Sequence, residues 1–584
     1  MKSISLKNRI IKNELFLYLG ILLLASFLRF PFLGNPPLND VEAKLALSAL
    51  DIQKGAPLAQ SAQPLYISLT SLLFILSSNN FTARIVSAIA GCFFTLTPIF
   101  FKKWIGSKEA LLVGFFFAID PALISISRQA DSRMMALLIL VLFIASLFFS
   151  EKIFTGLTGG LLILCGFYFW QLCLLIFILL IFYYQISKGK NKIKLKINRF
   201  KTHVIEDTPY QLILGFFVSL LFIGTRLLSR PGLLNLIPQS LFSLINDWFI
   251  KGQLFNQSSF LIIFFISGYP LLILFCLAGI VQELIRKDKL SFFLLILLLL
   301  SFLFFLANPF VKPVDIYLFV FPMYYFVAKG FLSWWELFKE QLKEGLVISV
   351  PVICLLGFIW LAILRMLNLP IGSIDTAQML IALIGSLLLL GIIIVLIGWG
   401  WSVRSAISGL SLAIILILSI FQFSVSIHST GLTSRPESEL WSLEKYFKGS
   451  ELLMSTIKDI SLWNSGFKQR IDVAIVGIDA PSIIWALKDQ IIEKYDVIPS
   501  TRNASIVITK EGNEQTIDEK DYRGQKFALH SFPIWTINLE QSLTSIDFYR
   551  WLLLRDGYIK DDEIELWARA DLFVGNNRKF ESNY

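Results

Sequence analysis

The sequence predicts an α-helical polytopic membrane protein of about 13 transmembrane helices with a C-terminal extracytoplasmic α/β domain. The 584 residues are 55% hydrophobic and only 16% charged, whereas a soluble protein carries nearer a quarter charged residues. Apolar runs of about 20 residues recur, and each is long enough to cross the ~30 Å hydrocarbon core of a bilayer. Beyond about residue 430 the hydropathy falls and charges of both signs appear, which indicates a separate polar domain.

Thirteen candidate spans follow one another along the first part of the chain. They are residues 15–33, 82–101, 109–127, 134–150, 154–168, 170–186, 209–227, 258–283, 290–308, 314–330, 345–366, 377–399 and 405–427. The fifth and sixth are short and share one apolar run. Both are needed if the segments between spans are to fall on the sides of the membrane that their charges indicate.

Basic residues set the expected orientation, because cytoplasmic segments of membrane proteins are enriched in Lys and Arg. The N-terminal 14 residues and a loop at 188–201 are strongly basic, so we expect both in the cytoplasm. Thirteen crossings then place the C-terminus outside. The net charge of +10 is gathered largely in that loop, which argues against a nucleic-acid partner.

The polar segments predict the domains. Loop 34–81 is long and partly apolar, and its segments 39–51 and 64–78 are expected to be amphipathic helices on the membrane surface. Residues 1–429 would form the transmembrane domain and residues 430–584 the external α/β domain. Within the external domain, strands are expected at 472–477, 504–509 and 560–569, and helices at 481–494 and 543–555.

Two carboxylates lie just after the first span, in Asn39-Asp40-Val41-Glu42. Asn39 and Glu42 have the spacing of a capping box, so both acidic residues would simply favour a helix N-terminus. The same geometry would hold an ionised carboxylate at the membrane surface. There it would accept a proton from an attacking hydroxyl or amine or help to hold a metal ion. The sequence alone leaves both interpretations open.

Several motifs occur in an order that resembles the GT-C glycosyltransferases. The relevant branch contains the lipid A aminoarabinose transferases and the protein O-mannosyltransferases. The matching segments are Arg29 with Gly34-Asn-Pro-Pro, Asp40-Val-Glu42, Gln63-Pro64-Leu65-Tyr66, Arg84, Asp120-Pro121, Ser127-Arg128-Gln129-Ala130-Asp131, and Lys312 with Tyr317 and Pro322. The resemblance covers about residues 15–430. It departs from the family at Gly34-Asn-Pro-Pro, where the family has a plain Gly-x-Pro.

The resemblance implies roles for these residues. Asp40 would be the catalytic base, and Glu42 would shape the site or contact the acceptor. A basic residue must meet the phosphate that leaves, because charge builds there in the transition state. The candidates are Arg128, Lys312, Arg84 and Arg29, and for Arg29 and Arg84 the alternative is a side chain that snorkels at the end of a span.

Three further residues are candidates for the site, each with an alternative. Asp131 lies near the site or pairs locally with Arg128 or Arg133 at helical spacing. Tyr66 would open the second surface helix. Tyr317 lies near the site or belongs to an aromatic belt at the membrane surface.

The resemblance thus implies an integral-membrane glycosyltransferase of the cell membrane. It would move a sugar, with inversion, from a polyprenyl-phosphate donor to a lipid, glycan or protein acceptor on the outer face. A polytopic transporter or lipid flippase and a non-catalytic relative are the alternatives. The cofactor is unknown. A divalent cation would rest on Asp40 and Glu42 with other carboxylates, since the three histidines are too scattered for a metal cluster.

Overall fold

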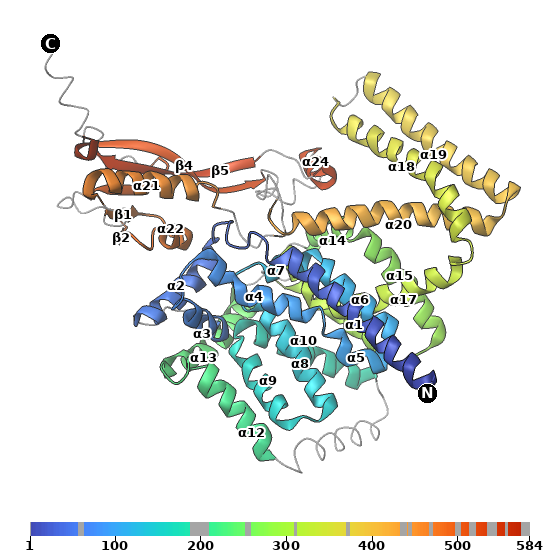
Figure 1. Cartoon of the computed structure of the whole chain (residues 1–584). Coiled ribbons are helices and arrows are strands. Elements are labelled where there is room, and N and C mark those ends of the chain that lie inside the picture. The colour runs from blue at the N-terminus through green and yellow to red at the C-terminus, as the bar shows by residue number, and fades with distance from the viewer. Residues whose placement is uncertain are drawn as a thin grey trace.

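The computed structural model of the chain (Figure 1) describes most of the membrane domain and the ordered elements of the C-terminal region. The described residues are 2–56, 63–186, 209–251, 258–308, 312–369, 374–432, 441, 447–466, 471–496, 504–512, 521–533, 546–554 and 559–573. The basic loop at 188–201, on which much of the expected orientation depends, lies outside them.

The described residues among the first 430 fold mainly into helices, which we call the bundle. The first ten helices are α1 (Lys2–Arg29), α2 (Asp40–Lys54), α3 (Pro64–Leu73), α4 (Asn80–Phe94), α5 (Pro98–Ile105), α6 (Ser107–Ile119), α7 (Pro121–Ser127), α8 (Arg133–Phe149), α9 (Lys152–Leu164) and α10 (Phe167–Ile186). The others are α12 (Pro209–Val218), η2 (Ser219–Ile223), η3 (Pro231–Asn235), α13 (Leu236–Ile245), η4 (Asn246–Lys251), α14 (Ser258–Gly268), α15 (Pro270–Arg286), α16 (Lys289–Ala307), η5 (Pro313–Phe319), α17 (Val320–Phe338), α18 (Leu342–Leu367), α19 (Ile374–Gly400) and α20 (Val403–His428).

The lengths and apolar character of these helices show a multi-pass membrane protein. Six helices in the described ranges are long and apolar enough to cross a membrane, and the number rises to nine if each of three bent pairs is one span. Three more apolar helices of 10–17 residues are shorter. The count of thirteen spans therefore stays a prediction, although every predicted span falls on apolar helix.

Helices α15 and α17 cross at an unusually close distance because both present glycine at the contact. A Cβ atom built on Gly279 would lie 2.0 Å from the carbonyl oxygen of Phe326, and one on Gly330 would lie 2.0 Å from that of Phe275. Small residues at helix crossings let the backbones approach and gain packing energy within lipid. This contact fixes the late part of the bundle, which carries Tyr317 and Tyr324.

A five-stranded sheet follows the membrane helices. Its strands are β1 (Asp472–Val476), β2 (Ile491–Tyr495), β3 (Ile506–Lys510), β4 (Tyr522–Pro533) and β5 (Ile559–Arg569), in the order β2-β1-β3-β5-β4. Strands β1, β2 and β3 are parallel, and β5 runs antiparallel to both β3 and β4. Helices α21 (Ser450–Ser465), α22 (Pro481–Ala486) and α24 (Ile546–Leu554) and the 3-10 turn η9 (Ala570–Phe573) complete the region. We call residues 450–573 the sheet unit.

The expected helix at 481–494 is wrong in its second half. Helix α22 ends at Ala486, and Ile491–Tyr495 instead forms β2, which pairs in parallel with β1. The β-branched pair Ile491-Ile492 suits a strand, and this tertiary pairing overrides the helical pattern. The expected strands at 472–477, 504–509 and 560–569 correspond to β1, β3 and β5, and the expected helix at 543–555 corresponds to α24.

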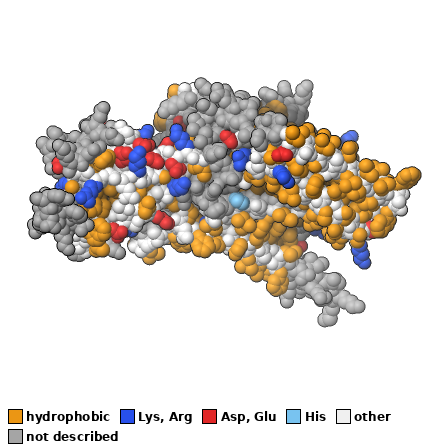
Figure 2. Space-filling model, turned by 90° about the horizontal axis from the view of Figure 1, so that it is seen from above, with side chains coloured by type: hydrophobic (Ala, Val, Ile, Leu, Met, Phe, Trp, Pro, Cys, Tyr) orange, Lys and Arg blue, Asp and Glu red, His pale blue; other side chains and the backbone are white. Residues whose placement is uncertain are grey.

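The sheet unit lies against the end of the bundle that carries α2 (Figure 1), and α2 packs directly on α22. The buried core of the bundle continues into the C-terminal region through Trp441, Trp485, Phe548 and Trp551, while a second core fills the sheet unit itself. Figure 2 shows charged side chains gathered over the sheet unit and hydrophobic ones over α18 to α20. Helix α19 is almost fully uncovered by protein, as expected of a lipid-facing helix.

Candidate active site

The N-terminus of α2 is built by a capping box. The Asn39 side chain accepts a hydrogen bond from the Glu42 amide at 2.9 Å, and the Glu42 carboxylate accepts one from the Asn39 amide at 3.2 Å. This reciprocal pairing satisfies two backbone donors that a helix start leaves open. The capping box expected from the sequence is confirmed, and it fixes the directions in which Asp40 and Glu42 project.

The Glu42 side chain points into the bundle, where hydrogen bonds use every acceptor position of its carboxylate. Its Oε1 accepts hydrogen bonds from Arg84 Nε and the Ala130 amide, both at 2.8 Å, and its Oε2 accepts from Arg84 Nη2 at 2.7 Å. With the Asn39 amide this makes four donors, which matches the number of lone-pair positions on a carboxylate. Glu42 therefore locks α2, α4 and the α7–α8 turn together.

Arg84 also ties down the segment that leads from the first span into α2. It donates to the carbonyl oxygens of Leu33, Pro36 and Pro37. Its side chain is only 5% exposed, and that of Glu42 only 4%. This is a buried and bidentate ion pair, not a snorkelling arginine.

Asp40 projects in the opposite direction, toward the sheet unit. Its Oδ1 accepts hydrogen bonds from the amide and the hydroxyl of Ser482, at 3.0 and 2.6 Å. Its Oδ2 lies 3.1 Å from Nε2 of His530, and the Asp40 side chain remains 29% exposed. Burial raises the pKa of the Asp40 carboxyl, but the hydrogen bonds from His530 and Ser482 outweigh it and leave the pKa below its ordinary value. Asp40 is thus an ionised carboxylate at the boundary between the two parts of the molecule.

The partners of Asp40 are placed by two local features of the sheet unit. Ser482 is in the first turn of α22, where backbone amides have no partner within the helix, and Pro481 begins that helix. His530 lies on β4 next to an irregularity in the β4–β5 register between Ala528 and His530. Neither Ser482 nor His530 was expected at the site from the sequence.

The other arginines lie close to this ion pair. Arg29 is fully buried and donates to the carbonyl oxygens of Ala25, Phe117 and Ala118. Arg128 uses Nη1 to hold the carbonyl oxygens of Leu28, Arg29 and Pro31. Burial lowers the pKa of Arg128 to about 10, and the charges of Arg84 and Arg29 add to the effect. The structure thus places Arg29, Arg84 and Arg128, three of the four predicted basic residues, close to the start of α2.

A second polar cluster lies deeper and joins Asp131 to residues that the sequence analysis did not select. Asp131 Oδ1 accepts from the Arg133 amide at 2.9 Å, and Arg133 Nε lies 3.4 Å from Asp131 Oδ2. Arg133 also donates from Nε to the Tyr168 hydroxyl at 2.7 Å and places Nη1 3.7 Å from Asp315. The local pair between Asp131 and Arg133 that the sequence suggested is therefore present. Burial nevertheless raises the pKa of Asp131 to about 6.

The remaining predicted residues take part in packing around these clusters. The Tyr66 hydroxyl donates to the Ala83 carbonyl at 2.9 Å and so joins α3 to α4. The Tyr317 hydroxyl lies 3.4 Å from Gln171 Oε1, beside the cluster of Asp131. Lys312 precedes η5, and its amide donates to Asp315 at 2.9 Å. Ionisable residues within or beside apolar runs are rare and mark candidate functional sites. A search for such residues would have selected Arg133 and Asp315.

A metal site is not evident in the part of the chain that the structure describes. There, no three His, Cys, Asp or Glu side chains are grouped so as to hold a metal ion. Glu42 has no lone-pair position left for a cation unless one of its four donors moves.

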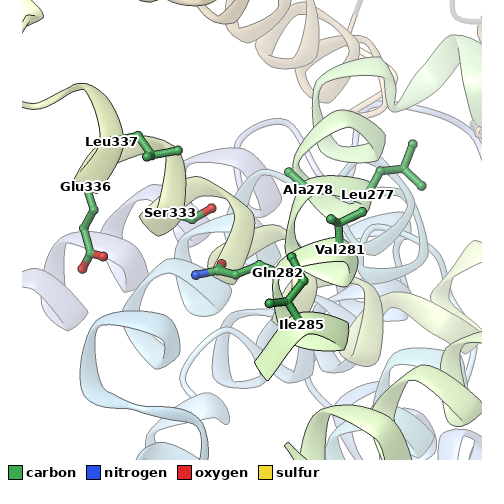
Figure 3. A pocket seen from close by; sticks show the side chains of 8 residues that line it. All are labelled: Leu277, Ala278, Val281, Gln282, Ile285, Ser333, Glu336 and Leu337. Atoms are coloured by element: carbon green, nitrogen blue, oxygen red, sulfur yellow. The ribbon is translucent and has the colours of Figure 1, made fainter. Parts of the chain in front are cut away.

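Two pockets lie away from Asp40. A groove of about 660 Å³ runs between α15 and α17 (Figure 3), where Leu277, Gln282 and Ser333 are among the lining residues. A second pocket of about 840 Å³ lies around the turn from α15 to α16 and includes Glu283. Neither is lined by a residue of α2 or of the sheet unit, so neither belongs to the site around Asp40.

Comparisons with known proteins identify the fold. No family model and no curated protein matches the chain. Among solved structures, the chain is similar to ArnT, an aminoarabinose transferase, from Cupriavidus metallidurans. In its apo state ArnT aligns over 96% of this chain and 99% of its own, with a TM-score of 0.52 and 13% identity. Bound to undecaprenyl phosphate, it aligns over 96% and 98%, with a TM-score of 0.52 and 12% identity.

An oligosaccharyltransferase from Archaeoglobus fulgidus, solved with zinc and sulfate, also matches. It aligns over 88% of this chain and 71% of its own at 12% identity, with a TM-score of 0.44. The agreement with ArnT extends over nearly the whole of both chains, from the helix bundle to the C-terminal region. The chain therefore has the fold of ArnT, which agrees with the GT-C-like fold that the order of its sequence motifs predicted.

Proposed function

We propose that this protein is a membrane glycosyltransferase that moves a sugar from a polyprenyl-phosphate donor to a lipid, glycan or protein acceptor. The observation that carries the proposal is the Asp40 carboxylate. It is ionised, partly exposed and held at the head of a surface helix where the bundle meets the sheet unit. ArnT, whose fold the chain shares, has been solved with undecaprenyl phosphate bound, and this supports a donor of that class.

The reaction would be a single displacement with inversion at the sugar. Asp40 takes the proton of the acceptor hydroxyl or amine while the acceptor atom bonds to the anomeric carbon. The bond from that carbon to the phosphate oxygen breaks, and its electrons leave with the polyprenyl phosphate. Arg128 and Lys312 are the candidates to meet this phosphate. The guanidinium of Arg84 is held in the buried ion pair with Glu42, and Arg29 is fully buried. The hydrogen bonds that hold Arg128 come from Nη1 alone. Phosphate charge develops during this step and is stabilised by cations already in place.

Membrane sidedness follows from the same proposal. The basic N-terminal segment would lie in the cytoplasm, and the sheet unit with Asp40 would lie on the outer face. The donor lipid stays in the bilayer, so the protein needs no nucleotide-binding loop, and the sheet unit is free to select the acceptor.

A reconstitution assay tests the function. The purified full chain is placed in liposomes with a panel of polyprenyl-phosphate sugars carrying a radiolabel and with a total membrane extract as acceptor. We expect label to appear covalently in an acceptor and free polyprenyl phosphate to accumulate in equal amount. Movement of the intact donor across the bilayer with no covalent product would instead identify a flippase. Neither product nor movement with any donor would indicate a non-catalytic relative.

A further inference from the structure

His530 reaches Asp40 from a distant part of the chain. The two side chains meet with Nε2 of His530 3.1 Å from Oδ2 of Asp40, and the histidine is only 14% exposed. Helix α22 packs on α2 at the same place, where the Ser482 amide and hydroxyl bind the other carboxylate oxygen. Two residues of the sheet unit, with three donor groups, therefore bind the one carboxylate that the bundle supplies.

These contacts make Asp40 a weak proton acceptor by itself. Three donors stabilise its ionised form, and a carboxylate that is stabilised in this way binds a proton less readily. Asp40 accordingly has a pKa below its ordinary value, even though its burial acts in the opposite direction. An imidazole ordinarily binds a proton more tightly than a carboxylate does, with a pKa of about 6.5 against about 3.9. The imidazole that Asp40 contacts is therefore the alternative proton acceptor at this position.

We propose that His530 and Asp40 form one catalytic base, in which Asp40 orients the imidazole and His530 takes the proton. This inference rests on the proposed transferase function, and within it His530 replaces Asp40 as the group that takes the proton. The acceptor O–H or N–H gives its proton to Nδ1 of His530 as its heteroatom bonds to the anomeric carbon. The carbon–oxygen bond to the phosphate breaks, and the polyprenyl phosphate leaves with the electron pair. The imidazolium that forms is stabilised by Asp40 at Nε2, as in other carboxylate–histidine pairs.

His530 lies between the two parts of the molecule. Asp40 faces it from α2, and Asp562 is its partner in the β4–β5 ladder. Because the sheet unit supplies one half of the base, the site is complete only when that unit is docked. Docking is held at a second point, where Trp485 Nε1 donates to Asn80 at 2.8 Å and the Trp485 ring packs on Phe74.

Three variants of the full chain separate proton transfer from docking. His530→Gln keeps a side chain that can donate to Asp40 but cannot take a proton. We expect its kcat to fall by about 100-fold or more, the usual size of a general-base contribution, with the acceptor KM within about threefold of the wild-type value. His428→Gln removes a histidine at the end of α20 and is the matched control, with unchanged kcat. Trp485→Phe removes the hydrogen bond to Asn80 and part of the buried ring, and so tests the effect of looser docking.

Chemical rescue gives the direct readout. His530→Ala is assayed with imidazole and a series of substituted imidazoles. We expect the rate to recover in part and to rise with the pKa of the added base, because the added molecule then takes the proton. A merely structural histidine would show no such dependence.

Several results would overturn the inference. The first is a kcat for His530→Gln within threefold of the wild-type value. The second is a His530→Ala enzyme whose rate no added imidazole restores. The third is a kcat for Trp485→Phe as low as that of His530→Gln. If the wild type transfers sugar and Asp40→Asn abolishes transfer, any of these results rejects the histidine alone. If the wild type transfers nothing from any donor, the transferase function fails and the inference fails with it.

Discussion

Glu42 and Arg84, 42 residues apart in the sequence, form a bidentate ion pair that is almost completely buried. Arg84 Nε lies 2.8 Å from Oε1 and Nη2 lies 2.7 Å from Oε2 of the carboxylate. The pair joins the start of α2 to α4, and the same guanidinium holds the backbone of the segment before α2. The contacts of Glu42 therefore fix the position of Asp40. Glu42 holds the helices together, whereas Asp40 faces the sheet unit.

Removal of one partner of this pair should be costly. We expect Arg84→Ala to destabilise the protein by about 3–5 kcal/mol, because it leaves the Glu42 charge buried without compensation. Thermal unfolding of the detergent-solubilised chain would show a clear loss of Tm. Lys526→Ala is the control, since Lys526 pairs with Glu511 at the exposed surface of the sheet unit and such pairs contribute little. Equal Tm losses for the two variants would contradict the assignment of Arg84 and Glu42 as a structural lock.

The Asp40 contact should make docking of the sheet unit sensitive to acid. The pKa of Asp40 is lowered in the folded state, so its contribution to docking is fully present above its ordinary pKa of 3.8 and is lost as the pH falls through the lower folded value. Hydrogen exchange of β1 and α22 between pH 3 and pH 7 measures this. We expect protection to fall in acid more steeply in the wild type than in Asp40→Asn, which has no charge to lose. The same slope in both proteins would show that Asp40 does not hold the unit.

The glycine contact between α15 and α17 gives a third prediction. Gly279→Ala places a methyl group 2.0 Å from the carbonyl of Phe326, so the helices must separate, at a cost of about 1–3 kcal/mol for overpacking. Gly385→Ala on α19 is the matched control, because nothing lies within 4 Å of the added methyl. We expect Tm to fall for Gly279→Ala and to stay level or rise slightly for Gly385→Ala. A Gly279→Ala protein as stable as its control would show that the two helices are further apart than described.

The sequence predicted the local features of the site and missed the distant ones. The start of α2 and its capping box depend on residues three positions apart, so spacing alone revealed them. The contact of Asp40 with Ser482 spans 442 residues, and that with His530 joins α2 to β4. No local pattern contains this information. The helix expected at 481–494 failed for a related reason, because pairing with β1 converts Ile491–Tyr495 into a strand.

The role of the arginines shows a similar limit. The sequence shows that these arginines lie at the ends of spans. It does not show which groups they contact, and those contacts decide their function. Arg84 is held by Glu42, Arg29 is fully buried, and Arg128 uses Nη1 to hold backbone carbonyls. Arg128 and Lys312 stay the proposed contacts of the phosphate. Arg133 was expected only as a local partner of Asp131, because its other carboxylate partner, Asp315, is far away in the sequence.

The central claim is that the Asp40 carboxylate takes part in chemistry, and its amide variant tests this most directly. Single-turnover transfer from a polyprenyl-phosphate sugar would be compared in wild type, Asp40→Asn and Asp51→Asn, the last being an acidic residue further along the same helix. We predict a loss of about 100-fold or more for Asp40→Asn, with normal folding, and no more than a threefold change for Asp51→Asn. Asp40→Asn turnover within threefold of wild type would contradict the account.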